Sequence, residues 1–315
     1  MTYTPVTTPP GGGATYDAPT PPVGPRSKRG RSSVHGRPNT ILTIAALGAV
    51  AYFLLPLWWL VVASTKSNTA LFSSFGLWFA DDFNIVQNLQ DVFTFQRGIF
   101  LTWIRNTVLY AVTSAVGAAA LATAAGYAFA KLRFPGSTAL FATILGAIMV
   151  PLTALAIPTY LLFARVGLTD TPWAIILPSL VSPFGVYLMR VYAASAVPDS
   201  LLEAARVDGA SELRIFFSIA LRLLAPGFVT VLLFALVATW NNYFLPLIML
   251  SSPEWYPLTV GLAQWQATSQ AGSGSQALFS MVITGSLVSI IPLMIAFLFL
   301  QRYWQSGLAT GGVKQ

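Results

Sequence analysis

Few side chains in this sequence could perform chemistry, and their spacing assembles no catalytic group. Cysteine is absent, and the single histidine, His35, lies in a polar stretch near the N-terminus where we expect it to be solvated. Glycine-rich phosphate loops, His-Glu-x-x-His metal motifs and Gly-x-Ser-x-Gly nucleophile motifs do not occur. The sequence therefore predicts no enzyme activity, no cofactor and no metal ion. We expect solvated surface charges at the scattered carboxylates Asp81, Asp82, Asp91, Asp170 and Glu254.

The bulk composition indicates that most of the chain lies in lipid. Of its 315 residues, 55% are hydrophobic and only 9% are charged, whereas soluble domains carry roughly 25% charged residues. The net charge of +7 could indicate nucleic-acid binding, but the basic residues fall mostly at the ends of apolar runs and no basic soluble module is present. We therefore expect an integral membrane protein that does not bind nucleic acid.

Six apolar runs are long enough to cross a hydrocarbon core of roughly 30 Å as helices. None of the six contains Asp, Glu, Lys, Arg or His. The fold class predicted from them is an all-α, polytopic bundle of six transmembrane helices, occupying residues 41–300. The runs are Ile41–Ala63, Thr107–Ala130, Ala139–Phe163, Pro172–Met189, Pro226–Leu250 and Leu278–Leu300.

The two ends of the chain are predicted to be cytoplasmic tails. Residues 1–40 are rich in Pro, Gly, Thr and Ser, a composition that predicts disorder, and residues 301–315 form a short second tail. Six spans place both tails on the same side of the membrane. With the N-terminus inside, 13 of the 17 Lys and Arg residues are cytoplasmic, as the positive-inside rule requires. The four that remain outside are Lys66, Arg97, Arg105 and Arg165.

A polar loop at about residues 195–222 separates the fourth and fifth spans. Asp208-Gly209 is predicted to end a short helix, with Gly209 in the left-handed C′ conformation, and Ser211 to cap a second helix. The apolar face expected for this second helix comprises Leu213, Phe216, Phe217 and Ala220. From these residues alone the loop is either a docking surface for a partner or an ordinary amphipathic helix at the membrane interface.

The same loop resembles the EAA signature of permease subunits of bacterial binding-protein-dependent ABC importers. The matching positions are Glu203, Ala204, Ala205, Asp208, Gly209, Ile219 and Leu221. In that family the loop sits in a cleft of the cytoplasmic ATPase, so the resemblance implies that these residues couple ATP hydrolysis to the membrane helices. This sequence departs from the signature at Arg222, where the family has proline.

Residues 41–315 also resemble the maltose-type, carbohydrate-uptake branch of this family. The matching residues include Asn106, Ala125-Gly126-Tyr127-Ala128, Met149-Val150-Pro151 and Trp240-Asn241-Asn242. The resemblance implies a type I importer-like permease in the cell membrane that transports a sugar or oligosaccharide. It further implies a second, homologous permease subunit, two ATPase subunits that hydrolyse the ATP, and an extracytoplasmic solute-binding protein.

Two alternatives to a sugar permease remain. A glycerophosphate-type polyol is an alternative substrate, because Arg105 and Arg165 flank the outer ends of spans. An ion-coupled secondary transporter is the alternative mechanism. It normally uses ionisable side chains or unwound helices within the membrane, and the six spans hold no ionisable side chain.

The candidate substrate path centres on two asparagines, Asn241 and Asn242, about 22 Å along the fifth span from Pro226. Each amide either bonds a neighbouring helix, with Ser280, Thr284 and Ser286 of the sixth span as partners, or faces the sugar route beside Trp240 as a stacking platform. The residues predicted for the path are Trp240, Asn241, Asn242, Ser280 and Thr284.

Overall fold

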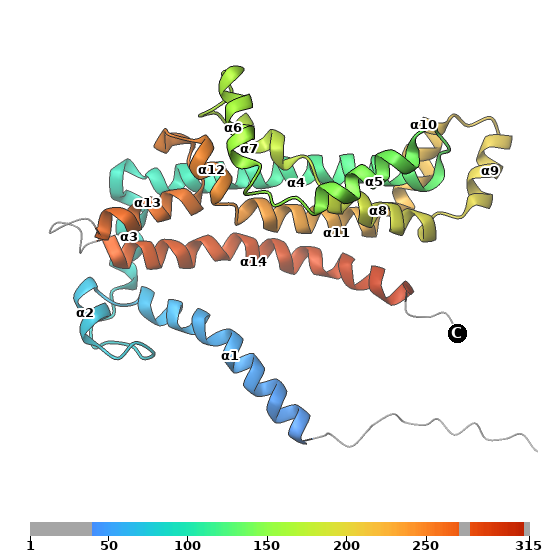
Figure 1. Ribbon diagram of the computed structural model, residues 1–315. Helices are drawn as coiled ribbons and strands as arrows, with labels where there is room; N and C mark the ends of the chain where they lie inside the picture. The colour runs from blue at the N-terminus through green and yellow to red at the C-terminus, as the bar shows by residue number, and fades with distance from the viewer. Residues whose placement is uncertain (1–39, 271–277, 312–315) are drawn as a thin grey trace, which may run out of the picture. The chain divides into compact units, whose positions relative to one another are not determined.

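The computed structural model describes residues 40–270 and 278–311, with side chains as far as Gln301. The predicted N-terminal tail up to residue 39 and the last four residues lie outside this range. The chain divides into two units, 1–51 and 52–315. In the first unit the described residues, 40–51, form the exposed beginning of helix α1 (Thr40–Ser64). In the second, the described residues form helices and connecting turns with no strand among them (Figure 1), which confirms the all-α fold class.

Within residues 40–270 and 278–311, five helices are long and apolar enough to cross a membrane. Their apolar sequences favour helix because a spanning helix satisfies every backbone polar group internally. They are α1, α4 (Ile99–Lys131), the segment Trp173–Ala196 that joins α7 (Trp173–Ser179) to α8 (Pro183–Ala196), the segment Glu212–Trp240 that joins α10 (Glu212–Ile215) to α11 (Leu221–Trp240), and α14 (Leu278–Gly311).

The third predicted span is not one helix, which corrects the expectation for Ala139–Phe163. It consists of α5 (Ser137–Ile148) and α6 (Ala156–Arg165), joined by turns at residues 149–155. Pro151 lies in this connection, and a proline disfavours helical geometry at the preceding residue and removes a backbone donor. The apolar stretch is therefore continuous in composition but interrupted in structure.

The fifth predicted span ends at Trp240 rather than at Leu250. Residues 241–243 break the helix before α12 (Phe244–Met249) begins. Pro246 accounts for this break, because it has no N–H to donate to the carbonyl of Asn242 and its ring would clash with that carbonyl in a continuous helix. The Asn242 carbonyl instead accepts a hydrogen bond of 2.8 Å from the Thr259 hydroxyl.

Several short helices lie outside the six predicted spans. These are α2 (Asn68–Ser73), α3 (Ile85–Thr94) and η1 (Phe95–Arg97), together with η3 (Pro253–Trp255) and α13 (Leu258–Gln270), which follow α12. They pack at the end of α4 that is remote from α9 (Asp199–Val207) and α10 (Figure 1). We refer to the region around residues 103–110, 170 and 249–258 as the far end of the bundle.

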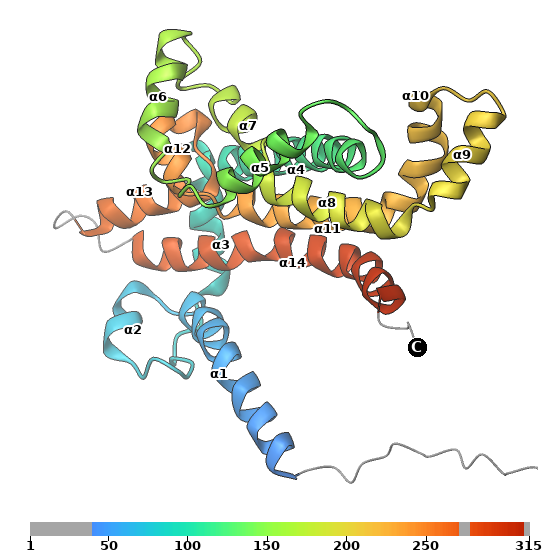
Figure 2. The same ribbon diagram turned by 45° about the vertical axis from the view of Figure 1, so that its right-hand side comes forward.

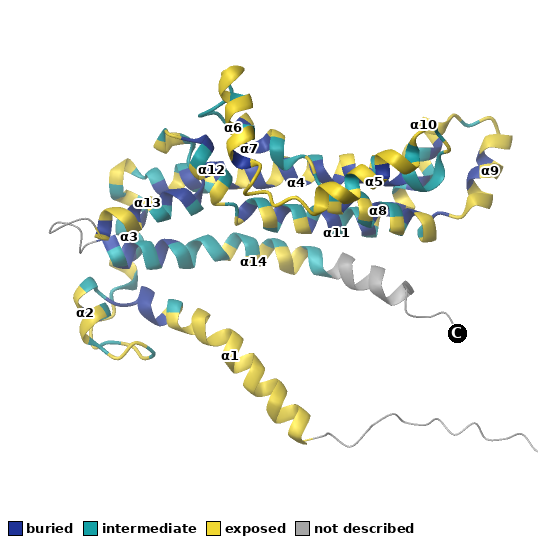
Figure 3. Ribbon diagram, in the orientation of Figure 1, coloured by how far each residue is buried: buried dark blue, intermediate teal, exposed yellow. Residues whose placement is uncertain are grey.

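Helix α4 lies beside α8 and α11 in both views (Figures 1 and 2) and is buried along much of its length (Figure 3). Its contact face is rich in alanine, and small side chains let helix backbones approach closely. A Cβ atom added to Gly126 would lie 2.7 Å from the backbone nitrogen of Arg190 on α8, so only glycine fits this crossing. Helices α4 and α8 therefore approach closely at Gly126.

Candidate functional site

The α9–α10 loop, residues 197–222, projects from one end of α8 and α11 (Figure 2). Gly209 ends α9 with φ +78°, the left-handed conformation predicted for it. The Ala210 N–H donates to the carbonyl of Ala205 and the Gly209 N–H to that of Arg206, each at 3.0 Å. This pair of bonds is a Schellman motif, which satisfies the last carbonyls of the helix. The predicted cap is also present, because the Ser211 hydroxyl accepts from the N–H of Arg214 at 3.4 Å.

Two ion pairs brace the loop. Arg206 and Glu212 join α9 to α10 across the Gly209 turn, with Nε–Oε1 at 2.6 Å and Nη2–Oε2 at 3.3 Å. Lys131, the last residue of α4, contacts Asp199 at the start of α9 at 2.8 Å. The hydrogen bond and charge of Lys131 lower the pKa of Asp199. The loop is therefore held both across its own turn and to a spanning helix.

The apolar side chains of the loop lie on two faces, one packed and one exposed. The packed face differs from the predicted apolar face. Ile215 and Ala220 are buried and Phe216 is half-buried, whereas Leu213 and Phe217 are 72% and 62% exposed. The face that packs consists of Ile215, Phe216, Ile219 and Ala220, which lie at i, i+1, i+4 and i+5 and therefore share one side of the helix. The predicted face omitted Ile215 and Ile219, and the segment Phe216–Ala220 is π-helical.

The predicted coupling residues lie on both sides of this division. The exposed ones are Glu203, Ala204, Asp208 and Gly209, whereas Ala205 is buried and Ile219 and Leu221 are half-buried. Beside the exposed group, Val207 is 87% exposed. The loop thus exposes three large apolar side chains, Val207, Leu213 and Phe217, together with the carboxylate of Glu203.

The residues predicted for the substrate path are not brought together. Trp240 is buried in a core cluster with Leu236 and Trp265. The Asn241 side chain is exposed, and its amide donates to the Val237 carbonyl at 2.9 Å. The Asn242 amide oxygen accepts from the N–H of Leu245 at 3.4 Å. Both amides therefore bond locally.

The hydroxyls of α14 proposed as partners for these amides bond elsewhere, which corrects that expectation. The Thr284 hydroxyl is buried and donates to the carbonyl of Ser64 at 3.5 Å, and that of Ser286 donates to the Val282 carbonyl. Ser280 is buried, and its backbone N–H donates to the amide oxygen of Asn68 at 3.0 Å. Ser280 and Thr284 thus fasten α14 to residues near the end of α1.

A network of hydrogen bonds at the far end, which we call the lock, was not predicted from the sequence. Asp170, expected to be a solvated charge, accepts from the N–H groups of Ser251 and Ser252 at 2.9 Å each and from the Ser252 hydroxyl. Burial acts to raise the pKa of Asp170, but these hydrogen bonds outweigh it and hold the pKa below its usual value. The positive φ of Asp170, +57°, is a backbone geometry that aspartate tolerates better than most residues.

Helix α4 completes this lock. The Asn106 amide donates to the carbonyls of Glu254 and Tyr256, at 2.7 and 3.1 Å. Trp103 donates to Pro253 and the Tyr110 hydroxyl to Trp255, both at 2.9 Å. The partners are separated by more than 140 residues, so no sequence window contains both. Asn106 itself was singled out only through the family resemblance.

The sequence pattern of the "Binding-protein-dependent transport system inner membrane component" family matches residues 122–308, more than half of the chain. This segment includes the α9–α10 loop. The chain belongs to this family.

Proteins of similar sequence align with most of the length of this chain. The chain is 34% identical to the "Arabinooligosaccharides transport system permease protein AraQ" of Halalkalibacterium halodurans, covering 87% of this chain and 96% of the relative. It is 33% identical to the "Maltodextrin transport system permease protein MdxG" of Bacillus subtilis, over 70% and 78% of the two chains. Among solved structures, a chain of a bacterial ABC transporter involved in import of the acidic polysaccharide alginate superposes with a TM-score of 0.73, at 25% identity, covering 86% of this chain and 99% of that one.

These findings make the protein a transport subunit rather than an enzyme. It is an inner-membrane permease of the ABC importer class, and membership in that class implies an ATPase and a solute-binding protein as partners.

Proposed function

We propose that this permease carries a sugar or oligosaccharide into the cytoplasm, driven by an ATPase that docks on the α9–α10 loop. The observation that carries the docking site is the exposure of Val207, Leu213 and Phe217 on a braced, polar loop. Exposed apolar side chains rimmed by polar ones are typical of protein–protein contact sites. The six apolar runs of the sequence contain no charged residue, and the relatives are named for carbohydrate substrates. Both observations support a neutral carbohydrate as the transported solute.

Within the docking surface we assign contact and support roles. Glu203 has no hydrogen bond or ion pair among the described residues, so its carboxylate is available to a basic partner. Ala204, Asp208 and Gly209 keep the surface thin around it. Ala205, Ile219 and Leu221 pack behind, where they transmit movement of the loop to α11.

We place both termini and the α9–α10 loop in the cytoplasm. The basic residues of the described chain that cluster at this end support that orientation under the positive-inside rule. They are Lys131, Arg133, Arg190, Arg206, Arg214 and Arg222. The complete importer then contains this chain, a second homologous permease subunit, two ATPase subunits and one extracytoplasmic solute-binding protein.

For the substrate route we propose Asn241 as the residue that meets the sugar, because its side chain is exposed where α11 ends. Asn242 holds the turn into α12, while Trp240, Ser280 and Thr284 support the helices from within. Asn241→Leu is expected to change the apparent affinity for the transported sugar and leave ATPase binding intact. Unchanged uptake kinetics in this variant would remove Asn241 from the route.

The decisive experiment is uptake by the complete importer in proteoliposomes. The assay compares labelled neutral oligosaccharides with a labelled glycerophosphodiester, each with its solute-binding protein. We expect neutral oligosaccharide uptake that requires internal ATP and survives collapse of the proton gradient. Uptake driven by the proton gradient without ATP, or confined to the glycerophosphodiester, would contradict the proposal.

A further inference from the structure

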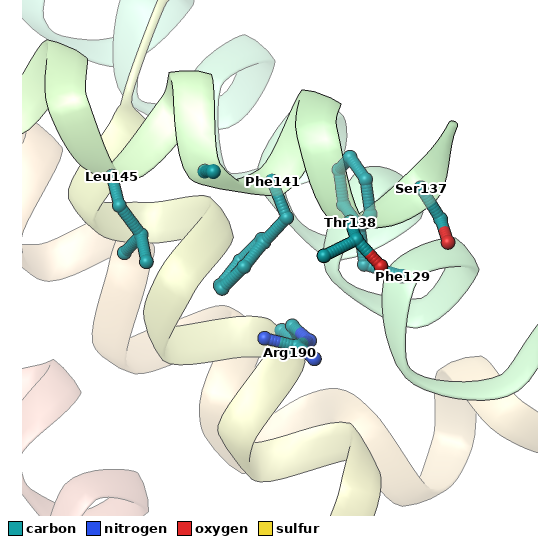
Figure 4. Close-up of a pocket in the computed structure, with 7 residues that line it drawn as sticks. Phe129, Ser137, Thr138, Phe141, Leu145 and Arg190 are labelled. Atoms are coloured by element: carbon teal, nitrogen blue, oxygen red, sulfur yellow. The ribbon is translucent and has the colours of Figure 1, made fainter.

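A cavity of about 320 Å³ lies between α4, α5 and α8, and no residue of the α9–α10 loop or of the candidate substrate path lines it. Figure 4 shows its walls. Phe129 comes from α4 and Arg190 from α8, and the remaining lining residues, Ser137, Thr138, Phe141, Ala142 and Leu145, come from the first turns of α5. The cavity combines one cation, two hydroxyl groups and an apolar wall.

Arg190 supplies an uncompensated charge to this cavity. Its guanidinium carbon lies 3.9 Å from the centroid of the Phe141 ring. Stacking uses a face of the guanidinium plane and leaves its N–H groups, which point outward in the plane, for acceptors. Among the described residues Arg190 has no hydrogen-bond acceptor or carboxylate partner, whereas the neighbouring Lys131 is paired with Asp199. No acidic residue lines the cavity.

The first turn of α5 adds further donors. Gly136 precedes the helix without a side-chain cap, and the Ser137 and Leu140 N–H groups donate to the carbonyls of Phe134 and Gly136. The N–H groups of Thr138 and Ala139 remain open to an acceptor. The hydroxyls of Ser137 and Thr138 stand at the same edge of the cavity (Figure 4). A bound group would therefore be a compact anion with several acceptor oxygens, as a phosphate is.

The position of the cavity selects the source of that phosphate. Arg190 lies six residues before the end of α8 at Ala196, about 9 Å along the axis and toward the loop end of a helix that can span the membrane. Leu145 in the cavity wall and the neighbouring Leu140 and Ile148 of α5 are large, exposed apolar side chains. An acyl chain can lie along this surface while its phosphate meets the guanidinium, whereas a free anion would leave the apolar wall uncovered.

We propose that this cavity is a binding site for an anionic phospholipid of the cytoplasmic leaflet, with Arg190 as its phosphate ligand. The site takes only the membrane orientation from the proposed function. It does not depend on the transported solute, and lipid binding is measured without transport, so failure of one proposal is distinguishable from failure of the other.

The test is lipid binding by the full chain in detergent, followed by native mass spectrometry. Phosphatidylglycerol, phosphatidylcholine and inorganic phosphate are titrated separately. We expect phosphatidylglycerol to bind more tightly than phosphatidylcholine by about fivefold to tenfold, the effect of one basic residue at a membrane surface, and inorganic phosphate not to compete at equal concentration. Equal binding of the two lipids would overturn the site, and competition by inorganic phosphate would reassign it to a free anion.

Three variants locate the effect. Arg190→Gln should abolish the preference for phosphatidylglycerol, and Arg133→Gln, at an exposed arginine outside the cavity, should retain it. Because loss of the Phe141 stack could also unsettle the fold, Thr138→Glu provides an independent route. It places a carboxylate beside Arg190 at a helix N-terminus, where a negative charge is favourable, and should displace the lipid phosphate while the protein remains folded. Retention of the preference in Thr138→Glu would overturn the assignment.

Discussion

The two ends of the bundle are held by different kinds of contact. The α9–α10 loop is braced across its own turn by residues six positions apart, Arg206 and Glu212. The far end is locked by hydrogen bonds between residues 81 to 150 positions apart, from Asp170 to Ser251 and from Trp103 to Pro253. Helix α4 contributes to both and separates them by about 42 Å between Trp103 and Lys131.

This difference suits a helix bundle driven from one end. The Arg206–Glu212 pair lets the two helices of the loop move together, and the Lys131–Asp199 pair passes that movement to α4. A long-range lock keeps the loops that follow α6 and α12 in register with α4. We therefore expect damage to the α9–α10 loop to affect coupling, and damage to the far end to affect stability.

The largest effect is expected from Gly209→Val. Valine at φ +78° costs roughly 1–2 kcal/mol, and its side chain would enter the docking surface, since no atom lies within 4 Å of the added Cβ. We expect nearly complete loss of uptake with normal membrane insertion, measured together with co-purification of the ATPase.

Gly167→Val is the matched control for that variant. Gly167 has φ +68° and similarly open surroundings, but it follows α6 rather than α9. The backbone penalty is the same and the docking surface is untouched, so uptake should persist. Equal loss of uptake in the two valine variants would show that backbone strain, rather than the position in the α9–α10 loop, is responsible.

A smaller effect is expected from Glu203→Ala. Removing the carboxylate deletes one charge-assisted hydrogen bond to the partner, which corresponds to about tenfold weaker association. Uptake should fall without vanishing, and excess ATPase should restore it. Glu254→Ala, an exposed glutamate at the far end, should leave the ATPase titration curve unchanged.

Substitutions at the far end should lower the stability of the protein rather than its binding to the ATPase. Asp170→Ala leaves the N–H groups of Ser251 and Ser252 without their acceptor, a loss of about 1–3 kcal/mol. We expect a lower Tm in detergent, unaltered ATPase binding, and no comparable change in Asp81→Ala. A drop in ATPase association instead would show that the two ends are not separable.

Asp170 also determines how the stability of the far end changes with pH. The folded-state pKa of Asp170 lies below its ordinary value of 3.8, so its stabilisation is present above that value and is lost as the pH falls through the lower, folded-state pKa. Below about pH 4, the Tm of the parent should therefore fall more steeply than that of Asp170→Asn. Parallel curves would refute the assigned role of the carboxylate.

The smallest effect is expected from the brace across the Gly209 turn. Arg206→Glu places two carboxylates together and should raise ATP hydrolysed per solute transported, with little change in Tm because exposed pairs contribute little to stability. The exchanged pair Arg206→Glu with Glu212→Arg should recover the parental ratio. Failure of the exchange to recover coupling would mean that Arg206 or Glu212 contacts the ATPase directly.

The sequence by itself determined the features that arise from neighbouring residues. Apolar runs without charge set the spanning helices, because a bilayer leaves the backbone no partner except itself. The Gly209 turn and the Ser211 cap were likewise readable, since each is completed within a few residues. The EAA pattern then connected this local structure with a family.

Only the tertiary structure decided features that depend on distant residues. Packing of Ile215 and Ala220 against α4 and α8 leaves Leu213 and Phe217 exposed. Asp170 became a structural acceptor, and Arg190 came to face α5, because helices far apart in sequence meet there. Local chemistry fixes where helices form, whereas which side chains meet is fixed by how those helices pack.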